Sequence, residues 1–337
     1  MGLKQAAQNA HQGRKSDAAR HRLQIAFEKD RLLSNVFGLH DENLIAIENR
    51  TGVSITARGN RVAIEGDERA ARLVEDALRE LYRRAEREER IDAGLVDAVL
   101  GLYVQSNDPV GEAPEGIVRL GSVSIRTRKK TVLPRTVAQA SYMQALASHD
   151  MIFALGPAGT GKTYIAIAQA VSQLIAGTVQ KLILSRPAVE AGEKLGFLPG
   201  DMKEKVDPYL RPIYDALNDC LPAEQVERRI AAGEIEVAPI AFMRGRTLAD
   251  AFVVLDEAQN TTPAQMKMFL TRFGEGSRMV ICGDPNQTDL PGGPSSSGLY
   301  DAINKLEGME GMAFQHFGIG DVVRHPIVGR IVQAYEG

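Results

Sequence analysis

Gly156-Pro157-Ala158-Gly159-Thr160-Gly161-Lys162-Thr163 is the stretch that decides the fold, because it reads G-x-x-x-x-G-K-T. The apolar run Met151–Leu155 precedes it, and a helical pattern rich in Ala and Ile follows it from Tyr164. A phosphate-binding loop requires this succession of strand, glycine-rich loop and helix. The glycines let backbone N–H groups converge on an anion, and the positive end of the helix faces that anion. We therefore expect Lys162 to reach the β- and γ-phosphates of a nucleotide, and the Thr163 hydroxyl to hold Mg²⁺.

The composition is that of an ordinary globular protein with about two domains. The 337 residues are 44% hydrophobic and 25% charged, and the net charge of −3 means that any nucleic-acid surface must be local. Cys220 and Cys282 are far apart in the sequence, which favours a reduced, cytoplasmic location. Six scattered histidines argue against a zinc site. Neither a signal peptide nor a membrane-spanning run is evident, so we expect no membrane contact.

Residues 1–20 are interpreted as a flexible tail, and residues 21–101 as a small α+β domain. A strand, a short helix, a hairpin and a long helix are expected at Leu23–Phe27, Leu44–Ile47, Val53–Ile64 and after the capping residue Asp67. The charged run Arg83–Arg90 is interpreted as a solvated helix face.

This order of elements resembles the K-homology (KH) RNA-binding fold. The loop that clamps a nucleic-acid backbone in that fold reads G-x-x-G. The corresponding residues here are Gly38-Leu39-His40-Asp41, and the carboxylate in place of the second glycine would repel a phosphate. The domain therefore has two interpretations, an RNA contact or a structural and docking role.

Residues 102–132 read as a linker followed by a basic β-ribbon. Turn-forming residues fill Asn107–Gly116, and the segment Ile117–Arg135 carries six basic residues and no acid. Such a ribbon suits a nucleic-acid contact, because phosphates dominate that kind of affinity. The alternative is a basic segment that folds onto an acidic neighbour.

A second constellation separates an ATPase from other phosphate-loop proteins. The apolar run Ala251–Leu255 predicts a buried parallel strand that ends in Asp256 and Glu257. Asp256 is placed to anchor Mg²⁺, and Glu257 to orient or deprotonate an attacking water. We also expect a helix capped by Thr262, with Met266, Phe269, Leu270 and Phe273 on its buried face.

A third apolar strand, Met279–Cys282, leads into the polar loop Gly283–Gln287. Loops at the carboxyl ends of such strands contact ligands in doubly wound sheets. Gln287 is a candidate sensor of the γ-phosphate, because an amide contact present only before hydrolysis would distinguish nucleotide states. Asp284 either supports that contact or caps the loop.

These three motifs resemble those of superfamily 1 helicases, and the surrounding sequence resembles the PhoH-like ATPase family from about Leu133 to the end. The marks of that family are the segments Leu184–Asp201, Phe242–Arg246 and Asp321–Pro326. Members of the family with a KH-like front end extend the resemblance over most of the chain. It implies an ATPase domain at 133–337 that acts on RNA, and an RNA-processing protein as a further partner.

The resemblance also implies roles for single residues. Gln139 stands where superfamily 1 enzymes read the adenine edge, although locally it could be a surface residue of the helix Thr136–Ala147. The loop from Gly156 through Tyr164 would bind the nucleotide. Arg186 would contact nucleic acid or transmit the nucleotide state.

Phosphoryl transfer usually needs a cation on the developing charge. A single ATPase core can obtain it from a neighbouring subunit in a ring, so we expect a homo-oligomer. Arg324 is the candidate arginine, with Arg244 or Arg246 in reserve and a structural salt bridge as the alternative.

The sequence thus predicts an α/β protein with a RecA-like phosphate-loop core and mostly parallel sheet, preceded by a small α+β KH-like domain. The expected function is Mg²⁺-dependent ATP hydrolysis coupled to RNA binding, remodelling or unwinding. The alternative is a nucleotide-gated RNA-binding adaptor without unwinding activity. A small-molecule kinase lacks support, because no acceptor-binding segment stands out.

Overall fold

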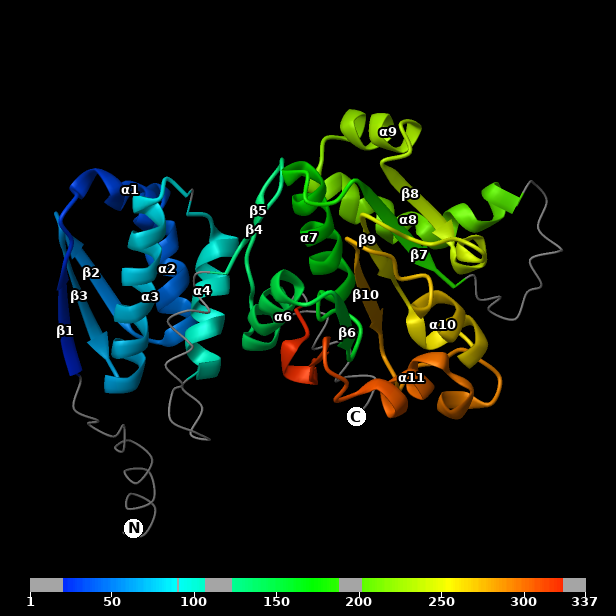
Figure 1. Cartoon of the computed structure of the whole chain (residues 1–337). Coiled ribbons are helices and arrows are strands. Elements are labelled where there is room, and N and C mark those ends of the chain that lie inside the picture. The colour runs from blue at the N-terminus through cyan, green and yellow to red at the C-terminus, as the bar shows by residue number, and fades with distance from the viewer. Residues whose placement is uncertain (1–20, 90, 107–122, 188–201, 324–337) are drawn as a thin grey trace, which may run out of the picture. The chain divides into compact units, whose positions relative to one another are not determined.

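Two compact units make up the chain, Met1–Glu112 and Ala113–Gly337. The computed structural model describes residues 21–89, 91–106, 123–187 and 202–323 (Figure 1). The expected tail at 1–20, the segment 107–122 of the linker and ribbon, part of the family mark at 188–201 and Arg324 lie outside the described residues.

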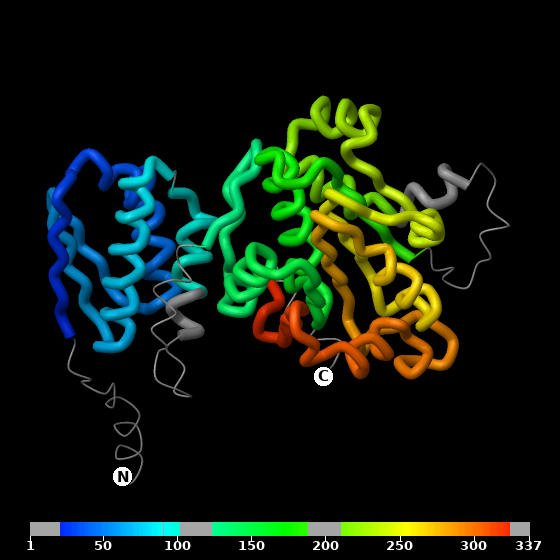
Figure 2. The backbone as a smooth tube through the Cα atoms, viewed as in Figure 1, coloured from blue at the N-terminus to red at the C-terminus, as the bar shows by residue number. Residues whose placement is uncertain are grey.

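A three-stranded antiparallel sheet organises the first unit, in the order β1-β3-β2. Its strands are β1 (His21–Ala26), β2 (Ser54–Arg58) and β3 (Arg61–Gly66). The α-helices are α1 (Leu33–Phe37), α2 (Glu42–Thr51), α3 (Glu68–Glu86) and α4 (Ala93–Ser106). The unit is a small sheet-containing domain, as the sequence predicts, and its path can be followed in Figure 2.

Local sequence signals explain two boundaries in this unit. Gly59 and Asn60 form the two-residue turn between β2 and β3. Gly59 has φ +58°, a conformation that glycine adopts without strain. Asp67 begins α3, and its side chain accepts hydrogen bonds from two backbone N–H groups of the first turn.

The structure describes residues 83–89 of the charged run Arg83–Arg90, and they are only partly the solvated face that the sequence predicts. Arg84 is 3% exposed, and its guanidinium donates a hydrogen bond of 2.9 Å to Glu80. A long charged side chain can bury its stem while its head pairs with an acid one helical turn earlier. The expectation was therefore wrong for Arg84.

A six-stranded sheet organises the second unit, in the order β11-β6-β10-β9-β7-β8, and every neighbouring pair is parallel. The strands are β6 (Met151–Leu155), β7 (Lys181–Arg186), β8 (Ile235–Pro239), β9 (Ala251–Leu255), β10 (Arg278–Gly283) and β11 (Met312–His316). All residues of β6 and β9 are buried, which is typical of parallel strands covered on both faces. The predicted α/β fold with a parallel sheet is confirmed.

Helices cover both faces of this sheet (Figure 1). One face packs against α6 (Val137–Ser148), α7 (Lys162–Ala176) and α8 (Met202–Cys220), and the other against α10 (Pro263–Leu270) and α11 (Gly298–Leu306). Helix α9 (Ala223–Ala231) contacts β8. Successive residues of β6 alternate between the two cores: Ile152 joins the first and Phe153 the second.

The strand β6 lies where the progression of the chain across the sheet reverses. From β6 the chain crosses to β7 on one side, and from β10 it crosses back to β11 on the other side. Ligands of such sheets bind beside this point, at the carboxyl ends of the strands. The sheet order therefore places the candidate site at the ends of β6, β10 and β9.

The helix after Thr262 is shorter than its apolar pattern suggests. Thr262 caps α10 with a reciprocal hydrogen bond to Gln265, and both Met266 and Phe269 are buried as predicted. Phe273 lies beyond the end of the helix and is 36% exposed, so its expected place on the buried face was wrong.

The described part of the basic ribbon is a short antiparallel hairpin, β4 (Ile125–Arg126) and β5 (Thr131–Val132). Lys130 forms an ion pair with Asp219 of α8. The neighbouring Lys129 ammonium donates to a backbone carbonyl of the same helix at 2.8 Å. Part of the ribbon thus folds onto an acidic neighbour, which was the alternative interpretation.

Candidate functional site

The glycine-rich loop connects the end of β6 to the first residue of α7. Three of its glycines have positive φ values, +142° at Gly156, +85° at Gly159 and +83° at Gly161. A Cβ atom at Gly156 would lie 2.4 Å from the carbonyl oxygen of Phe317, so no larger residue fits there. The loop therefore presents its backbone N–H groups at the N-terminus of α7, the arrangement that binds phosphate.

The ammonium group of Lys162 folds back over this loop. It donates to the carbonyl oxygens of Gly156 at 2.6 Å and Pro157 at 2.8 Å. Burial lowers the pKa of Lys162, while nearby acidic groups oppose that shift. The loop carbonyls hold the cation at the position from which it can turn to an incoming phosphate.

Thr163 and Asp256 meet although they are far apart in the sequence. The Thr163 hydroxyl donates a hydrogen bond of 2.5 Å to Oδ1 of Asp256, which follows the last residue of β9. Burial raises the pKa of Asp256, and the charge of Glu257 raises it further. A hydroxyl and a carboxylate in contact are oxygen donors that suit Mg²⁺, which prefers one or two protein oxygens together with phosphate and water.

Glu257 is held in a constrained position beside this pair. Its backbone has φ +50°, which is unusual for a residue with a side chain. Its Oε2 atom accepts a hydrogen bond of 2.5 Å from Gln259, and its Oε1 atom lies 3.3 Å from the Arg186 guanidinium. Arg186 also lies 3.9 Å from Oδ2 of Asp256. One arginine thus faces both acids.

The loop after β10 is connected to Glu257 through Gln259. The N–H group of Asp284 donates to Oε1 of Gln259 at 3.1 Å. The Asp284 carboxylate accepts the N–H of Asn286 at 3.0 Å, so it caps its own loop, one of its two expected roles. Sequence reasoning did not single out Gln259, because nothing local shows that its amide spans two strand ends.

These residues line one cleft of about 850 Å³ at the carboxyl end of the sheet. Lys162, Thr163, Asp256, Glu257 and Gln287 all face it, so the fold brings the predicted phosphate, metal and water groups together.

Tyr164 and part of α8 complete the wall of this cleft. The Tyr164 hydroxyl donates to Asp219 at 2.9 Å, and its ring centroid lies 5.4 Å from the Lys130 ammonium. Burial raises the pKa of Tyr164 to about 12. The tyrosine therefore remains an uncharged wall of the cleft at neutral pH.

Gln139 lies beneath the loop and is only 4% exposed. Its amide nitrogen donates to the Thr160 carbonyl at 2.9 Å, and its amide oxygen accepts the Arg135 N–H at 2.8 Å. The interpretation of Gln139 as a surface residue was therefore wrong. Contact with an adenine edge stays a prediction.

The candidate arginines are not gathered at the cleft. Arg246 donates two hydrogen bonds to the Glu236 carboxylate, at 2.6 and 2.7 Å. Arg244 is exposed, and Arg324 lies outside the described residues. Among the described residues that line the cleft, Arg186 is the only arginine.

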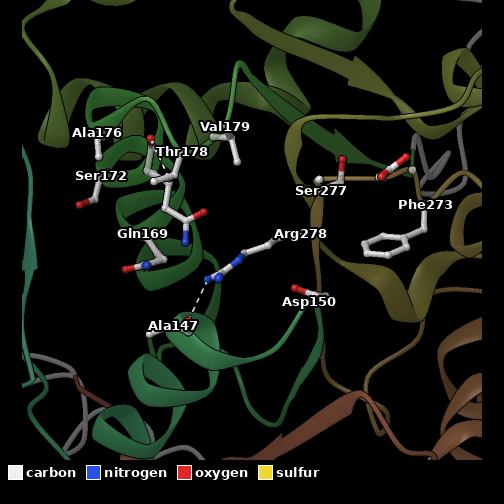
Figure 3. Close-up of a pocket in the computed structure, with 14 residues that line it drawn as sticks. Ala147, Asp150, Gln169, Ser172, Ala176, Thr178, Val179, Phe273, Ser277 and Arg278 are labelled. Atoms are coloured by element: carbon white, nitrogen blue, oxygen red, sulfur yellow. Dashed lines mark hydrogen bonds between the residues drawn. The ribbon is translucent and has the colours of Figure 1, made fainter.

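A second cleft of about 640 Å³ lies at the opposite ends of the strands (Figure 3). Residues of α7 and the segment Phe273–Arg278 line it. The Arg278 guanidinium donates to the Ala147 carbonyl at 3.1 Å, as the dashed line between these two residues marks in Figure 3. None of the predicted site residues lines this cleft.

Comparison with known proteins gives one consistent family. Residues 131–336 match the family described as PhoH-like protein. The PhoH-like protein of Bacillus subtilis is 46% identical over 302 residues, covering 90% of this chain and 93% of the relative. The PhoH-like protein of Mycobacterium tuberculosis (strain H37Rv) is 46% identical over 304 residues, covering 90% of this chain and 85% of the relative.

Protein PhoH of Escherichia coli K12 is 45% identical over 222 residues, covering 65% of this chain and 62% of that protein. In the part of the chain that the structure describes, no helix combines the length and apolar character that a membrane crossing requires.

Proposed function

The chain belongs to the PhoH-like protein family, and from this premise we propose that it is a Mg²⁺-dependent ATPase. The observation that carries the proposal is the 2.5 Å contact between Thr163, which follows the glycine-rich loop, and Asp256, which follows the end of β9. This contact aligns two oxygen donors beside a loop built for phosphate and beside a carboxylate, Glu257. The Thr163–Asp256 contact, the phosphate loop and the Glu257 carboxylate together support hydrolysis of a nucleotide better than nucleotide binding alone.

The proposed reaction is attack of water on the γ-phosphorus of ATP. A bond forms between the water oxygen and phosphorus, and the bond from phosphorus to the bridging oxygen breaks. The electron pair of that bond leaves on ADP, and Glu257 takes the proton of the water. Lys162 contacts the β- and γ-phosphates. Mg²⁺ held by Thr163 and Asp256 would neutralise charge on the phosphate oxygens.

Gln287 is proposed as the group that distinguishes ATP from ADP. It lines the cleft, and its N–H donates to the carbonyl of Asp284, so its loop is closed on itself. An amide that contacts the γ-phosphate before hydrolysis and loses it afterwards supplies the differential affinity that a switch requires.

The test of the ATPase proposal is the variant Glu257→Gln. We expect ATP binding near the wild-type affinity and a rate of hydrolysis lower by about 10²- to 10⁴-fold, because the base is lost and the shape is kept. Glu310→Gln, an exposed change in the same unit, is the matched control. Unchanged turnover in the Glu257 variant would overturn the role of Glu257.

Action on RNA and assembly into a homo-oligomeric ring are the finer parts of the proposal. The first unit supports the RNA part, because its chain order of strand, helices, hairpin and long helix resembles the order expected of a KH-like domain. Arg126 and Arg128 remain exposed on the basic hairpin. Turnover stimulated by RNA, with strand displacement, favours a motor. ATP-dependent RNA binding without displacement favours the adaptor.

The remaining assignments stay proposals of the same kind. They are the KH-like domain at 21–101, the ATPase domain at 133–337, the adenine contact of Gln139, the arginine supplied by Arg324 and the cytoplasmic location. The mass of the active protein in solution tests the ring, since a subunit that works alone needs no partner's arginine.

A further inference from the structure

The guanidinium of Arg186 lies between the two acids that the proposed reaction uses. It ends β7, and its side chain is 21% exposed in the cleft. One of its nitrogens lies 3.3 Å from Oε1 of Glu257, and another lies 3.9 Å from Oδ2 of Asp256. Adjacent carboxylates repel each other when both are ionised. A cation that faces both of them therefore stabilises their charged forms.

The two oxygens of Asp256 are divided between different partners. Oδ1 accepts the Thr163 hydroxyl, and Oδ2 faces Arg186. The carboxylate that would hold Mg²⁺ thus also balances the charge of the arginine. When a divalent cation binds this carboxylate, it compensates the negative charge of the acids. The attraction between the Arg186 guanidinium and the acids then weakens.

Phosphoryl transfer requires a cation on the developing charge, in cis or from a partner. Arg246 is committed to Glu236 outside the cleft, whereas Arg186 lines the cleft beside Glu257. In the proposed reaction Glu257 and the γ-phosphoryl group share one water. The guanidinium of Arg186 therefore lies beside the carboxylate that would share this water with the phosphoryl group.

We propose that Arg186 is a catalytic arginine supplied in cis, which exchanges the acid pair for the transferred phosphoryl group when Mg²⁺ and ATP bind. This inference rests on the proposed ATPase function. In the nucleotide-free protein Arg186 offsets part of the negative charge of Asp256 and Glu257. In the transition state it stabilises the charge on the equatorial oxygens of the phosphoryl group.

The exchange predicts opposite effects on two ligands. In Arg186→Ala the acids have lost a competing cation, so Mg²⁺·ADP binds at least as tightly as to the wild type. The complex of Mg²⁺, ADP and aluminium fluoride, which mimics the transferred group, loses about 10²-fold or more in affinity. Turnover falls by about 10³-fold, at the lower end of the range for catalytic arginines.

The experiment measures both affinities by calorimetry on the full-length protein, with thermal melting as a check on folding. Arg229→Ala is the matched control, because it removes an ion-paired arginine outside the cleft. Arg186→Gln and Arg186→Lys repeat the test if the alanine variant does not fold. The expected result is a loss confined to the fluoride complex in the Arg186 variants.

Two results overturn the inference. An equal loss for Mg²⁺·ADP and for the fluoride complex means that Arg186 is only a structural counter-ion. Unchanged affinity for the fluoride complex means that the cation comes from elsewhere, including a partner subunit. Failure of the ATPase proposal is recognised separately, because the wild type would then neither bind Mg²⁺·ADP nor hydrolyse ATP.

Discussion

Replacement of Gln139 by leucine distinguishes two proposed roles of this side chain, bracing the phosphate loop and contacting the base. The change removes both hydrogen bonds of the amide and keeps the side-chain volume nearly unchanged. Thr160 is fully buried, so the loss of its hydrogen bond costs about 1–3 kcal/mol. Arg135 is exposed, and water can replace its partner. If nucleotide binding must supply this free energy to bring the loop back to its wild-type conformation, the nucleotide binds about 5- to 150-fold more weakly.

The assay compares the affinities of fluorescent ATP and GTP analogues, together with the melting temperature. Bracing predicts that both affinities fall by the same factor and that the melting temperature falls with them. Gln144→Leu, on the exposed side of the same helix α6, should change none of these quantities. A loss of ATP affinity that spares GTP would refute the bracing argument and favour contact with the adenine edge.

Two further predictions concern the stability of the second unit. Phe269→Ala removes a fully buried ring and should lower the free energy of unfolding by about 3–5 kcal/mol, whereas Phe242→Ala, at a position 55% exposed, should change it by about 0.5 kcal/mol or less; equal losses in thermal melts would contradict this packing. The hydrogen bond from Arg246 lowers the pKa of Glu236 in the folded protein. The ion pair therefore stabilises the fold fully above the unfolded pKa of about 4.3, and this stabilisation is lost as the pH falls through the lower pKa of the folded state. Glu236→Gln should therefore destabilise by about 1 kcal/mol or less at pH 7, and by progressively less below about pH 4; a difference that does not change with pH in urea denaturation would refute the linkage.

Local patterns were sufficient for most of the elements and for the main groups of the site. The glycines before Lys162, the apolar strand before Asp256 and the cap at Thr262 each act over a few residues. A turn and a helix cap form between residues a few positions apart, and a short apolar run predicts a buried strand before its neighbouring strands are known. The same reasoning fails for Phe273, where the helix ends before the apolar pattern does.

Contacts between strand ends lay beyond the sequence patterns. Arg186 is 70 positions from Asp256, and only the order of the strands makes β7 and β9 neighbours. The burial of Gln139 could not be predicted from the sequence for the same reason, because it depends on how α6 packs beneath the loop. A polar side chain on a helix pattern is interpreted as exposed unless a distant partner is known.

The sheet order also explains why groups of the candidate site from different strand ends form one hydrogen-bonded network. Strand β10 lies between β6 and β9, so the end of β10 separates the phosphate loop from the acids. Gly283 ends that strand, and a Cβ atom there would lie 2.7 Å from Oε1 of Gln259. The absent side chain lets the Gln259 amide bridge Glu257 to the backbone of Asp284. In the proposed reaction, movement of the loop that carries Gln287 would therefore be transmitted to the carboxylate that would orient the water, so sensing and hydrolysis would share one hydrogen-bonded path.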